Sequence, residues 1–162
     1  MADTQPYVSP PRDGPEGIGG WLILPVIGLC LTPLRALLQL GLFSSLKDAF
    51  AFLTGGQKTF LIAEMVLNFG IILVLPIVLL VLLFNKRKTF PRLYVIWAVL
   101  CLIFLVGDLI MAKAMFSDVF AAGSVELLDA ETLKDVLRTA VLVAVWVPYM
   151  LNSRRVRNTF VQ

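Results

Sequence analysis

Residues 60–84 read FLIAEMVLNFGIILVLPIVLLVLLF, and this run decides the class of fold. Its only strongly polar residues are Glu64 and Asn68, so it is long and apolar enough for a helix that crosses a bilayer, which takes about 20 such residues. The whole chain has the same character, because 59% of its 162 residues are hydrophobic and only 15% are charged. An ordinary soluble domain is roughly half apolar and a quarter charged. The surplus apolar surface must therefore face lipid, and a soluble globular protein is excluded.

Three further apolar runs predict membrane-spanning helices on either side of this one. The expected spans are residues 18–42, 60–84, 93–116 and 133–151. The fourth apolar run is short and contains Arg138, so its helix is expected to begin in the polar stretch before it, with Asp129 as the N-cap. The sequence thus predicts an all-α integral membrane protein with four transmembrane helices in a domain over residues 17–152.

The segments outside the spans differ in composition. Residues 1–16 carry four prolines and three acids, a composition that predicts a disordered tail. The links at 44–59 and 115–128 mix large apolar residues with charges, which predicts short amphipathic segments on the membrane surface. In the first of these links, Gly55 and Gly56 are expected to form a turn.

Basic residues concentrate on one side of the predicted bundle. With four spans, both termini lie on the same side as the link between the second and third spans. This side carries Lys86, Arg87, Lys88 and Arg92 in the link, and Arg154, Arg155 and Arg157 in a basic tail over residues 153–162. The opposite side mixes bases with many acids, so the positive-inside rule predicts cytoplasmic N- and C-termini. The same bases are possible contacts for anionic lipids, although setting the topology is the simpler explanation.

Charged side chains inside the spans are the candidates for a functional site. At 1.5 Å per residue, Arg35 lies about 25 Å and Asp108 about 22 Å from the inner ends of their helices. Glu64 lies one turn into a helix that runs inward, and Asn68 follows it on the same face. All of them fall in the outer part of a hydrocarbon core about 30 Å thick. We expect Arg35 to bridge the two carboxylates in one polar cluster.

Two interpretations of this cluster stay open. The cluster can simply lock the helices together, or it can bind a small anion or a lipid headgroup, or couple a proton to movement. One arginine against two acids leaves excess negative charge. Protonation of one carboxyl, help from Lys113 or access of water would have to offset that charge.

The composition narrows the chemistry that the chain can perform. It has no histidine and two cysteines, which argues against haem, zinc and redox-disulfide chemistry and against a catalytic triad. Cys30 and Cys101 lie within apolar helices, where cysteine acts as a small hydrophobe. The net charge of +3 arises from bases that flank spans, whereas a nucleic-acid binder needs them on one solvated face. We therefore expect no cofactor, no metal site and no nucleic-acid partner.

Prolines and glycines within the spans predict local departures from regular helix. Four prolines, Pro25, Pro33, Pro76 and Pro148, each remove a backbone hydrogen-bond donor, and kinks are expected there. Residues 17–20 read GIGG, which is expected to loosen the start of the first helix for close packing. It does not match a dinucleotide-binding loop, because Leu22 stands where the third glycine would be.

Two motifs near the ends of the hydrophobic region carry a family resemblance. Residues 17–25 read GIGGWLILP and are followed by TPLR at 32–35, while WVPY at 146–149 precedes SRRVRNTF at 153–160. Together these motifs resemble the bacterial family catalogued as domain of unknown function 2569. The resemblance implies a four-helix, multi-pass protein of the bacterial inner membrane, and it implies neither a reaction nor a catalytic residue.

These observations favour a small non-enzymatic membrane protein that acts as an accessory or regulatory module. Its expected partners are membrane lipids and either further copies of the chain or another membrane protein. The alternative is an oligomeric transporter or channel-like protein that uses the Arg35, Glu64 and Asp108 cluster for an anion or a proton. A lipid-modifying enzyme would have to use Glu64 and Asp108 as its acid and base.

Overall fold

The computed structural model describes residues 14, 16–40, 50–117 and 130–161, and of Gln39 and Leu40 it describes the backbone. Every regular element in these ranges is helical. In chain order they are η1 (Gly20–Leu22), α1 (Ile23–Leu40), α3 (Gly55–Asn68), η2 (Phe69–Val74), α4 (Leu75–Phe84), α5 (Phe90–Met115), α7 (Ala130–Asn152) and α8 (Arg154–Thr159). Four helical runs are long and apolar enough to cross a membrane, as predicted: Gly20–Leu38, Gly55–Phe84, Phe90–Met115 and Ala130–Asn152.

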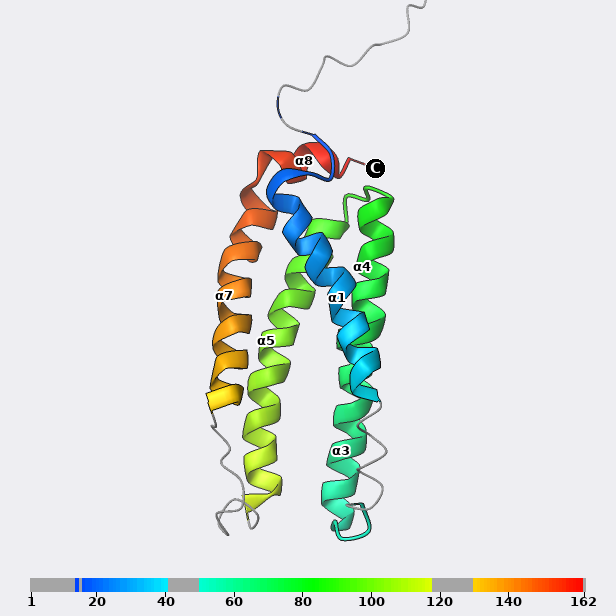
Figure 1. Ribbon diagram of the computed structural model, residues 1–162, viewed down its shortest axis with the longest axis vertical. Helices are drawn as coiled ribbons and strands as arrows, with labels where there is room; N and C mark the ends of the chain where they lie inside the picture. Colours follow the sequence, from blue (N-terminus) through cyan, green and yellow to red (C-terminus); the bar gives the residue numbers. More distant parts are fainter. Residues whose placement is uncertain (1–13, 15, 41–49, 118–129, 162) are drawn as a thin grey trace, which may run out of the picture.

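The four long helices run roughly along one axis (Figure 1). Helix α8 and residues 16–22 lie together at one end, which we call the terminal end; the opposite end is the far end. Helix α7 packs along α5, whereas α1 crosses in front of the bundle and packs against α4 and η2. Helices α1 and α7 therefore diverge towards the far end, with α5 between them.

The second span begins inside the predicted turn. Gly55 and Gly56 form the first turn of α3, because Thr54 and Gln57 make a capping box at its start. The Thr54 N–H donates to Gln57 Oε1 at 3.0 Å, and the Gln57 N–H donates to Thr54 Oγ1 at 3.5 Å. Such reciprocal bonds satisfy donors that a helix start otherwise leaves free. The expectation of a turn at Gly55 and Gly56 is therefore wrong.

Between α3 and α4 the helix widens into the π-helical turn η2, shortly before Pro76. In this register the carbonyl of residue i accepts from the N–H of residue i+5. The Leu75 N–H donates to the Gly70 carbonyl in this way. The next donor in the series would be residue 76, but proline has no N–H, so the Ile71 carbonyl loses its backbone partner.

Helix α4 ends in a tight turn whose hydrogen bonds are those of a Schellman motif. The Arg87 N–H donates to the Leu82 carbonyl and the Lys86 N–H donates to the Leu83 carbonyl, each at 3.0 Å. Lys86 occupies the position that usually holds glycine, with φ of 50°. This turn places Lys86, Arg87 and Lys88 on the exposed terminal end and leads directly into α5.

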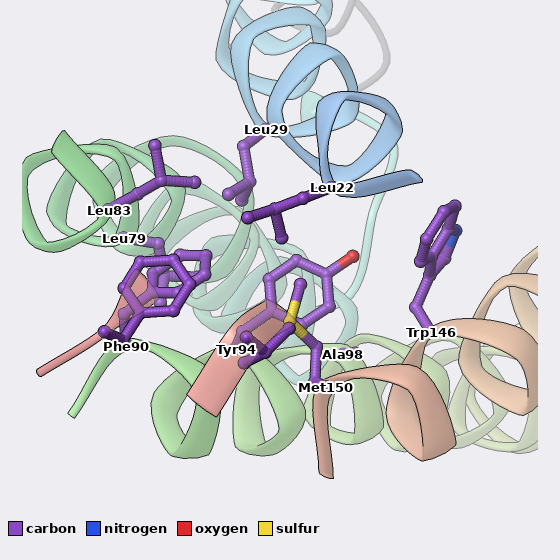
Figure 2. Close-up of a cluster of buried hydrophobic side chains, with 11 residues drawn as sticks. Leu22, Leu29, Leu79, Leu83, Phe90, Tyr94, Ala98, Trp146 and Met150 are labelled. Atoms are coloured by element: carbon purple, nitrogen blue, oxygen red, sulfur yellow. The ribbon is translucent and has the colours of Figure 1, made fainter. Parts of the chain in front are cut away.

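The buried side chains gather at the terminal end. Leu22 and Leu29 of the first span meet Leu83 of α4 and Phe90 of α5, and Figure 2 shows this cluster with Met150 of α7 beneath it. The Phe90 and Phe160 rings pack with centroids 4.6 Å apart, which ties the segment after α8 into the same core. Elsewhere most residues of the spans are not buried within the monomer.

The predicted basic tail contains a helix that closes on the start of the chain. The Gly17 N–H donates to Thr159 Oγ1 at 3.0 Å, and Thr159 is buried. A Cβ at Gly19 would lie 3.1 Å from Arg155 Nη1, so the glycine lets the guanidinium rest against the backbone. We call this contact of Gly14 and residues 17–20 with α8 the terminal clasp. It joins the two motifs that carried the family resemblance.

The helical runs differ in length. At 1.5 Å per residue, Gly55–Phe84 is about 45 Å long and Phe90–Met115 about 39 Å, against about 32 Å for η1 with α1, residues 20–40. Figure 1 shows α3 and the end of α5 reaching beyond α1 and α7 at the far end. The predicted tail at 1–16 lies almost wholly outside the described residues. Asp129, residues 44–49 of the amphipathic segment expected at 44–59 and residues 118–128 of the one expected at 115–128 also lie outside them.

Candidate functional site in the spans

The candidate site lies along the contact of α3 with α5, two antiparallel neighbours. At the far end, Gln57 Nε2 donates to the Met115 carbonyl at 3.0 Å. The rings of Phe60 and Phe116 pack edge to face there, with centroids 6.3 Å apart. Two contacts of different kinds thus fix the register of the helices at their far ends. We call this contact the α3–α5 seam.

The two predicted carboxylates lie on the same seam, near enough to interact electrostatically. Glu64 lies seven residues after Gln57 and Asp108 lies seven residues before Met115, so both fall on the seam side of their helices. Both residues are half-buried, and their carboxylates interact electrostatically. Asn68, one turn beyond Glu64, is half-buried as well. The structure therefore brings together Glu64 and Asp108, two of the three predicted charges.

Arg35 is not part of that pair. Its Nη2 lies 3.9 Å from Asp135 Oδ2 on α7, and its side chain is 63% exposed. Among the described ion pairs, none joins Arg35 to Glu64 or Asp108. The expected bridge across both carboxylates is therefore not formed. The sequence places Arg35 only by its position along the first span, and α1 crosses the bundle so that Arg35 meets the start of α7 instead.

Two other polar residues of the spans, Thr32 and Lys113, also lie outside the carboxylate pair. Thr32 Oγ1 donates to the Gly28 carbonyl on its own helix at 2.8 Å, a bond that satisfies the hydroxyl within α1. Lys113 is exposed in the last turn of α5. Neither residue adds a described hydrogen bond or ion pair to the carboxylates, so the seam holds two acids without a described cation within 4.0 Å.

The seam continues towards the terminal end through Trp97. Its Nε1–H donates to the Ile71 carbonyl at 2.8 Å, which is the carbonyl that Pro76 deprives of a backbone donor. In lipid an unsatisfied backbone group costs several kcal/mol, so a partner on a neighbouring helix is needed. Trp97 supplies it across the seam. Sequence reasoning missed this role, because the partner of Trp97 depends on how the second span packs against α5.

The basic residues predicted to contact lipid lie at the terminal end, as expected from the sequence. Lys86, Arg87, Lys88, Arg92, Arg154 and Arg157 are exposed, whereas Arg155 is half-buried. The role of Arg155 in the terminal clasp was not predicted. The glycines at 19 and 20 were the available signal, because such residues admit the close approach of a bulky side chain.

The described residues contain no group of three His, Cys, Asp or Glu side chains able to hold a metal ion. Cys30 is exposed on α1, Cys101 is half-buried on α5, and both are free thiols. What the site offers is therefore a carboxylate pair within a membrane-spanning helix pair, and an ion pair between α1 and α7.

Comparisons with known proteins place the chain in a family. The family model DUF2569, described as a protein of unknown function, matches residues 15–161. A relative in Escherichia coli strain K12, inner membrane protein YdgK, is 31% identical over 154 residues, which cover 91% of this chain and 95% of the relative. No solved structure matches the chain.

Proposed function

The chain belongs to the DUF2569 family and is a protein of the inner membrane, and on this premise we propose that it is a non-enzymatic accessory or regulatory module. Its partner is a transmembrane helix, either of another membrane protein or of a second copy of the chain. The observation that carries this proposal is the exposed surface of α3 and α5 along the half of their seam that is nearer the far end. We call this part the far half of the α3–α5 seam.

In this half, α3 has α5 as its described long-helix neighbour, and both helices present large apolar side chains outwards. Val66 of α3 is 66% exposed and Ile110 of α5 is 64% exposed. Membrane helices associate through close packing and polar contacts rather than through burial from water. The seam supplies the polar contacts through its half-buried carboxylate pair, and the outward faces of α3 and α5 supply the apolar ones.

Site-specific photo-crosslinking in native membranes tests this proposal. A photoreactive residue at Ile110 or Val66 should give a discrete protein adduct, while one at Ile96 or Val81 should not. Ile96 is a matched control because it lies on α5, nearer the terminal end, and is 60% exposed. Equal adducts at both ends, or none at Ile110 and Val66, would contradict the proposal. Tagged and untagged copies expressed together distinguish self-association from a different partner.

A second candidate function rests on the carboxylate pair. Because Arg35 is engaged by Asp135, Glu64 and Asp108 lie near each other within the seam, an arrangement that favours binding of a proton or a cation over an anion. An oligomeric transporter or channel-like protein would use this pair. Proton flux into proteoliposomes should then be lost in Glu64→Gln and Asp108→Asn and retained in Arg35→Gln. Flux that persists in both carboxylate variants would exclude this candidate.

We also propose that the terminal end faces the cytoplasm, because it carries the cluster of exposed bases. In a background without Cys30 and Cys101, a membrane-impermeant maleimide should label Ser117→Cys from outside the inner membrane. It should label Arg87→Cys only after the membrane is opened. The reverse pattern would invert the orientation.

A further inference from the structure

A groove of about 140 Å³ lies between α1, α5 and α7, on the face where α1 and α7 diverge. Small residues leave space for this groove, because Gly28 lines it from α1 and Ala98 lines it from α5. Leu24 and Leu142 line it and are also 50% and 47% exposed, so the groove opens sideways between α1 and α7. Its mouth faces the layer in which the four spans lie, which in a bilayer is hydrocarbon.

The groove has a mainly apolar wall with aromatic residues at its terminal side. Tyr94 and Trp146 both line the groove. Figure 2 shows the Tyr94 hydroxyl directed away from Phe90 and towards the side on which Trp146 lies. Apolar cavities of about 150 Å³ stay dry and take up small hydrocarbons. A hydrocarbon chain therefore fits this groove better than water does.

Charged side chains lie at both ends of the groove, an ion pair at one end and an arginine at the other. At one end, the Arg35–Asp135 ion pair joins α1 to α7 about one turn beyond the lining residues Thr32 and Thr139. At the other end, Gly20 lies one turn before Leu24, and a Cβ at Gly20 would lie 3.4 Å from Arg155 Cζ. The terminal side of the groove thus ends next to a guanidinium.

The dimensions confine the groove to one leaflet. From Leu24 to Thr32 it extends along α1 for about 12 Å, close to half of a hydrocarbon core about 30 Å thick. The exposed Arg154 and Arg157 stand with Arg155 on α8 at that leaflet's surface. Within the described residues, no carboxylate lies within 4.0 Å of these three arginines.

We propose that this groove binds one acyl chain of an anionic phospholipid from the leaflet at the terminal end, with the lipid phosphate held by the arginines of α8. The apolar groove holds the chain, the arginines select the charge of the headgroup, and the ion pair limits how far the chain extends. This site lies on a different face from the far half of the α3–α5 seam, so it is independent of the proposed partner surface.

Tryptophan quenching by brominated lipids tests this site in the intact protein. Trp21 is 70% exposed and is replaced by Phe, which leaves Trp97 and Trp146, both of which line the groove. The protein is reconstituted in phosphatidylcholine vesicles with rising fractions of phosphatidylglycerol brominated on one acyl chain, or of brominated phosphatidylcholine. Half-maximal quenching by the anionic lipid is expected at a lipid fraction about fivefold lower than for the neutral lipid. This factor corresponds to the contribution of roughly one basic contact to lipid binding. Equal quenching curves for the two lipids would overturn the proposal.

Variants separate the chain site from the headgroup site. Gly28→Leu and Thr139→Leu fill the groove from α1 and α7, and both should reduce quenching by the anionic lipid to the level of the neutral lipid. Gly107→Leu is the matched control, because a Cβ there also meets nothing within 4 Å but the residue does not line the groove. Arg157→Gln, exposed and outside the contact with Gly19, should remove the preference for the anionic lipid. Unchanged quenching in both filling variants would refute the site.

Discussion

The hydrogen bond from Trp97 to the Ile71 carbonyl explains how the second span tolerates a proline. Pro76 removes one backbone donor, and in the π-helical register of η2 the carbonyl left without that donor is the one of Ile71. The indole N–H of Trp97 on the neighbouring helix donates to this carbonyl instead. The π-helical turn in the second span and the tryptophan on α5 therefore act together to satisfy the backbone around Pro76. Its sequence signal is weak, because a proline and a tryptophan 21 positions apart meet only when the register of α3–α4 against α5 is known.

A double-mutant cycle tests this coupling. Trp97→Phe should destabilise the protein by about 1–2 kcal/mol, because it leaves a carbonyl unpaired within lipid. In a Pro76→Ala background the backbone regains its donor, so the same change should cost about 1 kcal/mol less. Reversible unfolding in mixed micelles measures both differences, and the loss of indole volume cancels between the two backgrounds. Costs that add within about 0.5 kcal/mol would show that the two residues are independent.

Arg35 illustrates the limit of reasoning from depth. Its height in the membrane follows from its position in the first span, but its partner depends on the direction in which α1 crosses the bundle. Asp135 lies within the expected fourth span and within α7, which begins at Ala130, but nothing in the sequence indicated that it would pair with Arg35. The carboxylate pair was predictable in part, because Glu64 and Asp108 lie at similar depths on helices that follow each other in sequence.

The partner of Arg35 can be established by coupling energies. Arg35→Gln and Asp135→Asn should each change stability by less than about 1 kcal/mol, because the pair is largely exposed and its atoms are 3.9 Å apart. The double variant should cost no more than either single one. Arg35→Gln combined with Glu64→Gln should instead be additive. A coupling between Arg35 and Glu64 larger than that between Arg35 and Asp135 would restore the predicted bridge.

At the scale of the elements, the turn from α4 to α5 carries a conformational cost. Lys86 adopts a left-handed conformation that disfavours residues with a Cβ by roughly 1–2 kcal/mol. Lys86→Gly should therefore stabilise the protein by about 1 kcal/mol, seen as a rise in the unfolding midpoint. Lys88→Gly in the same turn is the control and should give no such gain, because Lys88 is not in that conformation. A destabilised Lys86→Gly would mean that the lysine side chain itself supports the turn.

The ends of the helices were predicted less well than their existence. Long apolar runs indicate helices because lipid leaves the backbone few other ways to satisfy its hydrogen bonds. Their boundaries depend on short local signals, and the Thr54-x-x-Gln57 capping box was present in the sequence but was outweighed by the two glycines. Helix α8 had a signal as well, since Val156 and Phe160 are apolar and four residues apart, a spacing that places both on one face of a helix.

At the scale of the whole molecule, packing is uneven along the bundle. The buried cluster and the terminal clasp stabilise the terminal end, whereas the far half of α3 is held chiefly by the seam. In nanodiscs, amide exchange should be at least about tenfold faster over residues 58–64 than over residues 79–83. Gln57→Ala should accelerate exchange at the far end without changing α4. Uniform protection along both segments would show that lipid, rather than packing, sets local stability.

The terminal clasp also constrains the order in which the protein assembles. Gly17 and Thr159 are 142 positions apart, so at roughly 5–20 residues per second the ribosome needs about 7 to 28 s to make the second partner after the first. During that interval α1 is already made, while the helix that closes over its start does not yet exist. A chaperone or an insertion factor therefore has a defined window in which the GIGG segment is accessible, and release of α8 from the ribosome ends it.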